Sequence, residues 1–144
     1  MKLRETIIIF LFVTVLLISG AYYYVSHMVP HKTQLIEFDI KVTSGAPGFN
    51  LDKDKMHFGD VCIQCPVTRQ ITIRNDNSFS ERINFKIAST SLPLTNWISI
   101  DPSSYVISPG KTHYFQVTAS PSYEAKKKLY EGSLVVNRYK AFPW

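Results

Sequence analysis

The sequence predicts a mostly β fold, an antiparallel sandwich of seven or eight strands behind one N-terminal transmembrane helix. Thr6 to Val25 is 20 residues long and contains no charged side chain. After it, segments in which apolar and polar residues alternate recur roughly every 8–15 residues, as in antiparallel sandwiches. No stretch beyond Val25 keeps the period of about 3.6 residues that marks an amphipathic helix. At 144 residues the chain has room for one such domain.

The apolar N-terminal segment is long enough to cross a hydrocarbon core about 30 Å thick, at about 1.5 Å per helical residue. Lys2 and Arg4 precede it, which favours a cytoplasmic N-terminus and an exported remainder. A cleaved signal peptide is the alternative, because residues 19–21 are small. We expect the anchor to be retained, since the apolar run continues through residues 22–25 and tyrosine suits the outer membrane interface.

Composition shifts divide the chain into five parts. They are a cytoplasmic N-terminus at 1–5, a transmembrane helix at 6–25, a polar stalk at 26–33, a sandwich domain at 34–138 and an aromatic C-terminal tail at 139–144. A buried core helix is the other possible reading of residues 6–25, but no further helix is predicted that could surround it.

The first strand of the domain has the clearest pattern. Ile36, Phe38, Ile40 and Val42 alternate with charged residues, which is the period of a half-buried strand. Further strands are expected at 56–61, 67–74, 83–87, 97–100, 105–107, 113–118 and 132–136. The segment 44–54 between the first two has the Gly, Pro, Asn and Asp content of a loop or crossover.

Cys62 and Cys65 are the only cysteines and lie in the loop "CIQC" between two expected strands. A thioredoxin-type redox centre needs its first cysteine at a helix N-terminus, whereas Pro66 and a strand follow here. The same proline stands where haem attachment requires histidine. Exported cysteine pairs are normally oxidised, so we expect a local disulfide, with an interchain bond as the alternative. So small a ring mainly stiffens its own loop.

Metal binding by His57, Cys62 and Cys65 is the alternative function for this loop, because thiolates and imidazole suit zinc or cuprous copper. A closed zinc site takes four ligands, and the fourth would have to come from His113, the stalk or another chain. A structural role is the commoner explanation for a histidine on a strand. We therefore expect neither a metal nor another cofactor.

No pattern in the chain indicates catalysis. Gly-x-Ser-x-Gly, His-Glu-x-x-His, a glycine-rich phosphate loop and an Asp-rich calcium loop are all missing from the sequence. Asp52 and Asp54 fit a solvated loop better than a pair of acid and base. Basic residues are not interleaved with stacking aromatics, so nucleic acid is not an expected partner. We expect a protein that is not an enzyme.

The exported part is mildly basic, with 14 Lys and Arg against 10 Asp and Glu after residue 26. Lys126-Lys127-Lys128 is the one basic cluster along the chain, which a solvated surface or a contact with an acidic lipid or polymer would explain. Tyr139, Phe142 and Trp144 follow the last expected strand. These three rings are the candidate partner-binding residues, since such a tail can dock on a protein or at a membrane interface; the alternatives are a tail folded back on the sandwich or a disordered one.

Several motifs follow one another along residues 38–137, namely "MHFGDV", "RQITIRND", "FKIAS", "WISIDPSSYVISPGKTHYFQVTASP" and "EGSLVV". In this order they resemble the immunoglobulin-like sandwiches of the major-sperm-protein, ASH and PapD-like group. Those domains share an FG-x-V strand, an Arg-rich second strand ending in Asn, and a Pro-Gly turn before a strand ending in Pro. "CIQC" departs from the glycine that many relatives have after FG-x-V. The resemblance implies an immunoglobulin-like module that binds or scaffolds other molecules.

Together these patterns favour a membrane-anchored, extracytoplasmic binding or scaffold domain. We expect it to act as a non-catalytic accessory subunit, with other membrane or envelope proteins as partners and the bilayer contacted through residues 6–25. Two alternatives are a metal-handling domain for copper or zinc, and a secreted adhesin or carbohydrate-binding module released after Ala21.

Overall fold

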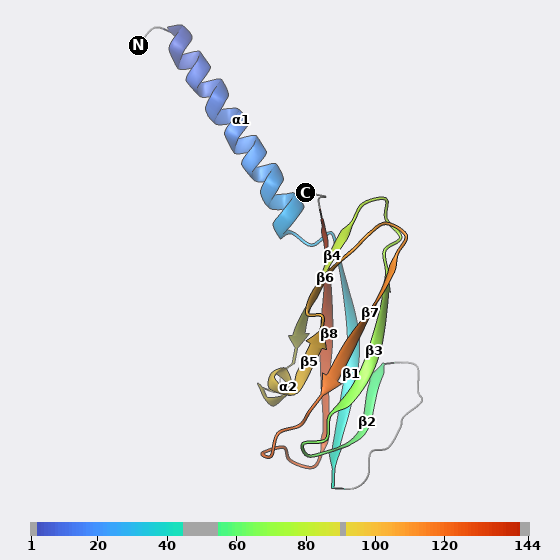
Figure 1. Ribbon diagram of the computed structural model, residues 1–144. Coiled ribbons are helices and arrows are strands. Elements are labelled where there is room, and N and C mark those ends of the chain that lie inside the picture. Colours follow the sequence, from blue (N-terminus) through green and yellow to red (C-terminus); the bar gives the residue numbers. More distant parts are fainter. Residues whose placement is uncertain (1–2, 45–54, 90–91, 142–144) are drawn as a thin grey trace.

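The structure, a computed structural model, describes residues 3–44, 55–89 and 92–141. One long helix leads into a domain of eight strands in two sheets, which we call the two-sheet domain (Figure 1). The helices are α1 (Leu3–Met28) and α2 (Leu92–Trp97). The strands are β1 (Lys32–Thr43), β2 (Met56–Cys62), β3 (Val67–Arg74), β4 (Glu81–Ala88), β5 (Ile98–Asp101), β6 (Ser104–Ile107), β7 (Thr112–Ala119) and β8 (Leu129–Lys140).

Helix α1 has the length and composition of a membrane anchor or a signal sequence. Its span Glu5–Ser26 has a mean hydropathy of 2.2, and none of that span is buried within the described residues. The helix ends at Met28 because Pro30 disfavours helical backbone at the residue before it. Only residues 29–31 then separate α1 from β1, so the connection is shorter than the stalk expected at 26–33.

The two sheets contain five and three strands. The order is β2-β1-β8-β4-β6 in the larger sheet and β3-β7-β5 in the smaller one. The expectation of a purely antiparallel fold is wrong at one place, because β1 and β2 run parallel. Parallel neighbours need a crossover of a dozen residues or so between them, and the long segment that joins these two strands provides it.

The inner faces of the sheets share one hydrophobic core. Phe85 of β4 meets Phe115 of β7 with ring centroids 4.8 Å apart, and Trp97 meets Tyr130 of β8 at the same distance. The first contact joins the two sheets, and the second joins the larger sheet to the end of α2, just before β5 of the smaller sheet. A large apolar side chain contributes about 1.5–3 kcal/mol when it is fully buried, so this shared core is what holds the layers together.

A β-bulge in β2 keeps its apolar residues facing the core. Met56 and Phe58 face inward in ordinary alternation, and Asp60 would be next. The register shifts between His57 and Asp60, where Gly59 has a φ of 77°. Glycine adopts this left-handed backbone without a steric penalty. The shift turns Val61, which is fully buried, toward the core in place of the aspartate.

Helix α2 was not expected from the sequence, which has no sustained helical period at this place. It is a helix of 6 residues whose Pro93 suits a first helical turn. The turn carries Leu94 and Trp97 into the core, where they are 0% and 5% exposed. The Trp97 carbonyl accepts a hydrogen bond from the Ser120 amide at 2.8 Å, which ties α2 to the end of β7.

Gly132 of β8 is required by the close approach of a core ring. It pairs with Phe38 of β1, and a Cβ at this position would lie 2.7 Å from the ring's Cζ. We expect Gly132→Ala to lower the free energy of unfolding by about 1–3 kcal/mol, because the buried ring must move. Denaturant titration followed by tryptophan fluorescence measures this. Gly20→Ala, in open space on α1, is the matched control and should leave the domain's stability unchanged.

Candidate functional site

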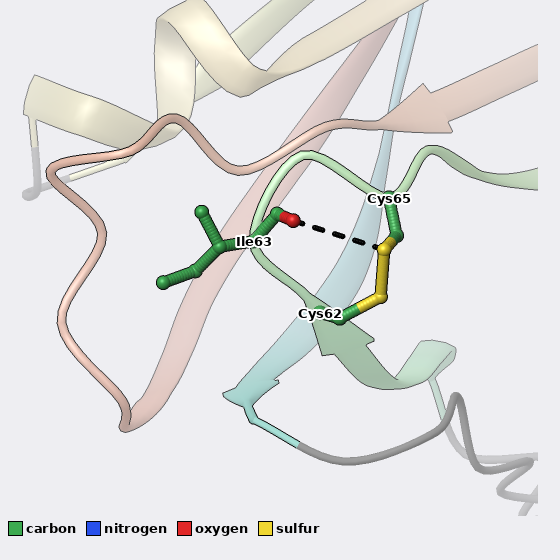
Figure 2. Close-up of a disulfide and its surroundings, with 3 residues drawn as sticks. All are labelled: Cys62, Ile63 and Cys65. Carbon is green, nitrogen blue, oxygen red and sulfur yellow. Dashed lines mark hydrogen bonds between the residues drawn. A yellow bond between two sulfur atoms is a disulfide. The ribbon is translucent and has the colours of Figure 1, made fainter.

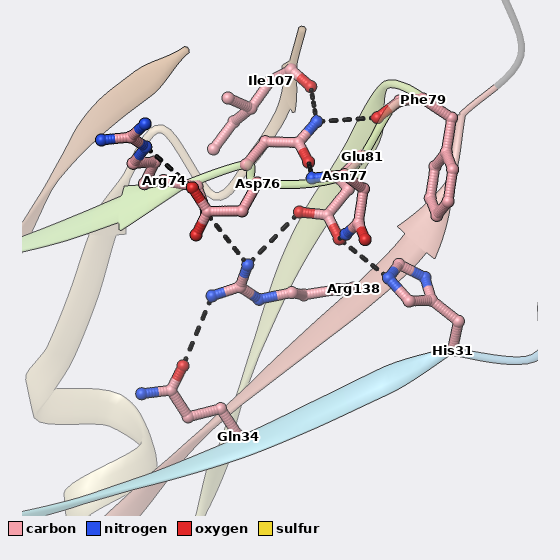
Figure 3. A network of polar contacts seen from close by, with 10 residues as sticks. His31, Gln34, Arg74, Asp76, Asn77, Phe79, Glu81, Ile107 and Arg138 are labelled. Atoms are coloured by element: carbon pink, nitrogen blue, oxygen red, sulfur yellow. Dashed lines mark hydrogen bonds and ion pairs between the residues drawn. The ribbon is translucent and has the colours of Figure 1, made fainter. Parts of the chain in front are cut away.

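A fully buried carboxylate lies at the end of the two-sheet domain that adjoins α1. Glu81, the first residue of β4, is 0% exposed. Its Oε1 accepts hydrogen bonds from His31 Nε2 at 2.8 Å and from Asn77 Nδ2 at 2.7 Å (Figure 3). Its Oε2 lies 3.3 Å from Arg138 Nη1. Burying a charge is costly unless it is paired and hydrogen-bonded, and these contacts meet both conditions.

Arg138 and His31 extend this network to β1 and β3. The Arg138 guanidinium also donates to the Arg74 carbonyl at 3.2 Å and to Gln34 Oε1 at 3.5 Å. The His31 amide donates to the Arg138 carbonyl at 2.9 Å, so the connection after α1 is bonded into the domain. The segment expected as a stalk therefore takes part in the folded structure at His31.

Asn75 holds the two loops next to this network. Its side-chain amide donates to the carbonyls of Phe79 at 2.8 Å and Ile107 at 2.9 Å. Its backbone amide donates to the Lys111 carbonyl at 2.9 Å, and its own carbonyl accepts from the Gly110 amide at 2.8 Å. The β3–β4 and β6–β7 connections are thus fixed to each other around one buried asparagine.

Tyr139, the first candidate partner-binding residue, is not part of a free tail. Strand β8 extends to Lys140, so Tyr139 is paired with Arg82 of β4. The Arg82 guanidinium carbon lies 5.3 Å from the centre of the tyrosine ring, a cation–π arrangement. The other two candidates, Phe142 and Trp144, lie outside the described residues.

The cysteine loop lies at the opposite end of the domain, where β2 gives way to β3. Cys62 and Cys65 form a disulfide with Cα atoms 5.2 Å apart (Figure 2). The Cys65 amide donates to the Cys62 carbonyl at 3.1 Å, and Gln64 between them has a φ of 62°. The 3.7 Å contact between Cys65 Sγ and the Ile63 carbonyl is van der Waals, because a disulfide sulfur carries no hydrogen.

This loop is bonded to the β7–β8 connection. The Gln64 amide donates to the Pro121 carbonyl at 2.9 Å, and Ile63 packs against the core. The Lys128 carbonyl in the same connection accepts from the Val42 amide at 3.0 Å. The lysine cluster 126–128 and the disulfide therefore share the end of the domain that is remote from α1 (Figure 1).

His57 of the alternative metal set has a different partner. Its Nδ1 lies 2.8 Å from Asp39 Oδ2, and both residues are buried on the outer side of β1 and β2. With the thiols of Cys62 and Cys65 joined to each other, a metal could bind there only after reduction. Within residues 3–44, 55–89 and 92–141, no three His, Cys, Asp or Glu side chains are placed to hold a metal ion.

A charged cluster next to His57 follows from the parallel pairing of β1 with β2. Lys55 lies 3.4 Å from Asp39 Oδ2 and 3.0 Å from Glu131 Oε1. The hydrogen bond to Glu131 raises the pKa of the Lys55 ammonium above its ordinary value of 10.5. Partial burial lowers this pKa, and the contact with Asp39 raises it further. These pairs therefore stabilise the folded state fully when the pH is below the ordinary pKa of lysine. Their contribution is lost as the pH rises through the raised pKa of Lys55.

A hollow of about 300 Å³ opens beside Lys55, over the outer face of β1 and β8. Glu37, Ser89, Glu131 and Ser133 are among the residues that line it. Charges of both signs meet here, so the hollow does not select an anion or a cation.

Sequence reasoning missed the network around Glu81 and the pair of Asp39 and His57. Both sets join residues far apart in the sequence, and they form only through the pairing of β4 with β8 and of β1 with β2. One signal was available for Glu81: it occupies an inward position of the alternation that continues through Ile83 and Phe85. A charged residue on the core face of a strand indicates a buried pair.

Comparison with protein-family models found no match to this chain, and no curated protein matched it either.

Replacing Arg138 with methionine leaves the Glu81 carboxylate without its cationic partner. We expect the free energy of unfolding to fall by about 3 kcal/mol, the usual cost of breaking a buried pair. Lys41→Met is the control, since Lys41 pairs with Asp60 at 3.1 Å on the surface, and such pairs contribute at most about 1 kcal/mol. Glu81→Gln combined with Arg138→Met should cost less than the sum of the two single variants; additive effects in denaturant titration would contradict the pairing.

Reduction of the disulfide should have a small global effect. Its ring is so short that chain entropy accounts for at most about 2 kcal/mol of stability. We expect a phosphine reductant to lower the unfolding free energy of the protein by no more than that, with the Cys62→Ser, Cys65→Ser variant unaffected by the reagent. Loss of the cooperative transition on reduction would show that the loop supports the whole core.

Proposed function

We propose that the chain is a single-pass membrane protein whose two-sheet domain is an extracytoplasmic binding or scaffold module. It would act as a non-catalytic accessory subunit of a membrane or cell-envelope assembly. The observation that carries the proposal is the exposure of α1: its large apolar side chains from Ile7 to Val25 are between 46% and 71% exposed. Burial of each of these side chains would contribute about 1.5–3 kcal/mol, so α1 is more stable when lipid or another protein surrounds it.

Retention of the helix is favoured by the way in which it continues into the domain. Cleavage after Ala21 would leave residues 22–28, with three tyrosines, as an exposed fragment of helix. His31 is hydrogen-bonded to Glu81 and Arg138 only three residues beyond Met28. An anchor that is attached so closely positions the domain at the membrane surface.

The export of the domain is supported by its disulfide, since such bonds persist in oxidising compartments. Lys2 and Arg4, which precede the apolar run at 6–25, support a cytoplasmic N-terminus. An immunoglobulin-like fold is supported by the two sheets around one core and by the resemblance to the major-sperm-protein, ASH and PapD-like group. The parallel pair of β1 and β2 is a local variation on that plan. Modules of this kind generally serve to bind other proteins, which is an argument from fold alone.

The anchor is tested by extraction of native membranes with alkaline carbonate. We expect the full chain to stay in the membrane pellet and its intact mass to include the N-terminal segment. Val15→Asp combined with Leu16→Asp should release it, because two acidic residues at the helix centre cost about 6 kcal/mol on insertion. Leu35→Asp, at a position 57% exposed on β1, is the control and should remain in the pellet. A mature protein that begins after Ala21 would instead indicate a secreted adhesin or carbohydrate-binding module.

The accessory role is tested by purification from native membranes in mild detergent. We expect another membrane or envelope protein to co-purify in a fixed ratio and to remain bound after size exclusion. A protein that emerges alone as a monomer contradicts the role. Stoichiometric copper or zinc in protein purified under reducing conditions would favour the metal-handling alternative.

A further inference from the structure

The net charge of the two-sheet domain is concentrated at one end. The end that adjoins α1 is called the helix-proximal end. It consists of the starts of β1 and β4, the ends of β3 and β8, and the β3–β4 and β6–β7 connections. Among the residues that the structure describes, the lysine, arginine, aspartate and glutamate residues at this end are Lys32, Arg74, Asp76, Glu81, Arg82, Lys111, Arg138 and Lys140. Six of these are basic and two are acidic, a net charge of +4. The other described residues of the domain include seven basic and six acidic ones, a net charge of +1.

Strand pairing brings these residues together from distant parts of the sequence. Lys32 at the start of β1 pairs with Arg138, and Lys140 pairs with Glu81 at the start of β4. Lys111 is joined to the β3–β4 connection through the Asn75 amide at 2.9 Å. Figure 1 shows the start of β1 and the end of β8 beside the C-terminal end of α1.

The accessible charge at this end is positive. The Glu81 carboxylate is fully buried and is paired with Arg138, so it presents no negative charge to the outside. Lys32 and Lys111 are exposed to solvent. The Arg74 side chain is 66% exposed and lies 2.8 Å from Asp76, which is the one acidic residue besides Glu81 among the described residues of this end.

We propose that the helix-proximal end binds the anionic phospholipid headgroups of the membrane that α1 enters. The proposal rests on the proposed function, in that α1 must be a retained anchor. The three residues between α1 and β1 then hold this end within reach of the headgroup phosphates. The electrostatic attraction of one basic residue to an anionic membrane favours the docked domain over the undocked one by about fivefold.

The position of the charge favours a lipid over a soluble acidic partner. The lysine cluster 126–128, which the sequence singles out, lies at the opposite end, but all the described residues outside the helix-proximal end together carry a net charge of only +1. The excess charge is found instead where the anchor leaves the domain. A soluble peptide could bind a basic surface at either end of the domain. A membrane surface can contact only the end from which the anchor α1 leaves.

The test uses the full chain in nanodiscs of phosphatidylcholine alone or of equal parts phosphatidylcholine and phosphatidylglycerol. Amide hydrogen exchange of Asp76–Phe79, in the β3–β4 connection, reports on contact at the helix-proximal end. We expect exchange there to slow at least about fivefold in the anionic discs and to recover in high salt. Exchange in residues 122–125 at the remote end should be the same in both discs.

Two variants with matched charge separate a local contact from a general attraction. Lys32→Gln, Lys111→Gln, Lys140→Gln should abolish the slowing, and Lys126→Gln, Lys127→Gln, Lys128→Gln should retain it. Each triple removes three positive charges and one cation–π contact, at Phe79 and Tyr130 respectively. Equal exchange in the two discs, or equal behaviour of the two variants, overturns the proposal. Failure of the wild-type chain to enter discs would overturn the anchor itself, and the lipid contact with it.

Discussion

The buried carboxylate of Glu81 is the constraint on which the arrangement at the junction with α1 depends. Once it is fully removed from water, it has to be matched by Arg138, His31 and Asn77, because an unpaired charge there would cost several kcal/mol. Those partners come from the end of β8, the connection after α1 and the β3–β4 connection. One acidic side chain thereby holds together three segments that lie far apart in the sequence. Because one of them is the connection after α1, this contact also keeps the domain close to the end of the helix.

The two ends of the domain differ in chemistry as well as in position. The helix-proximal end combines a buried ion pair with an accessible basic surface. The remote end carries the disulfide of Cys62 and Cys65 and a loop bonded to it through Gln64. In the proposed arrangement the first end lies against the membrane. The second end projects from it, and it is therefore the part that other components of an assembly can reach first.

The sequence was informative where one periodicity decides the structure. The helix from Leu3 to Met28 follows from an uncharged apolar run, and β1, β3, β4 and β7 follow from alternation between faces. The disulfide was predicted because Cys62 and Cys65 are the only cysteines and lie close together in the sequence, and because cysteine pairs of exported domains are normally oxidised. In each case the signal is local to a few neighbouring residues.

The remaining features depend on which strands become neighbours, which a single sequence does not specify. The parallel pairing of β1 with β2 places Asp39 beside His57, and the pairing of β4 with β8 places Glu81 beside Arg138. Tyr139 belongs to a strand because β4 offers it a partner at Arg82. Likewise, the sequence shows a basic cluster only at the contiguous residues 126–128. The basic surface at the helix-proximal end comes from six separate positions that the fold brings together.

Neutron reflectometry of the full chain in a supported bilayer that contains phosphatidylglycerol tests the central claim most directly. The account predicts protein density within the hydrocarbon layer that continues without a water gap into a domain lying against the headgroups on one side. A domain separated from the headgroups by a layer of solvent, or a hydrocarbon layer without protein, would contradict it.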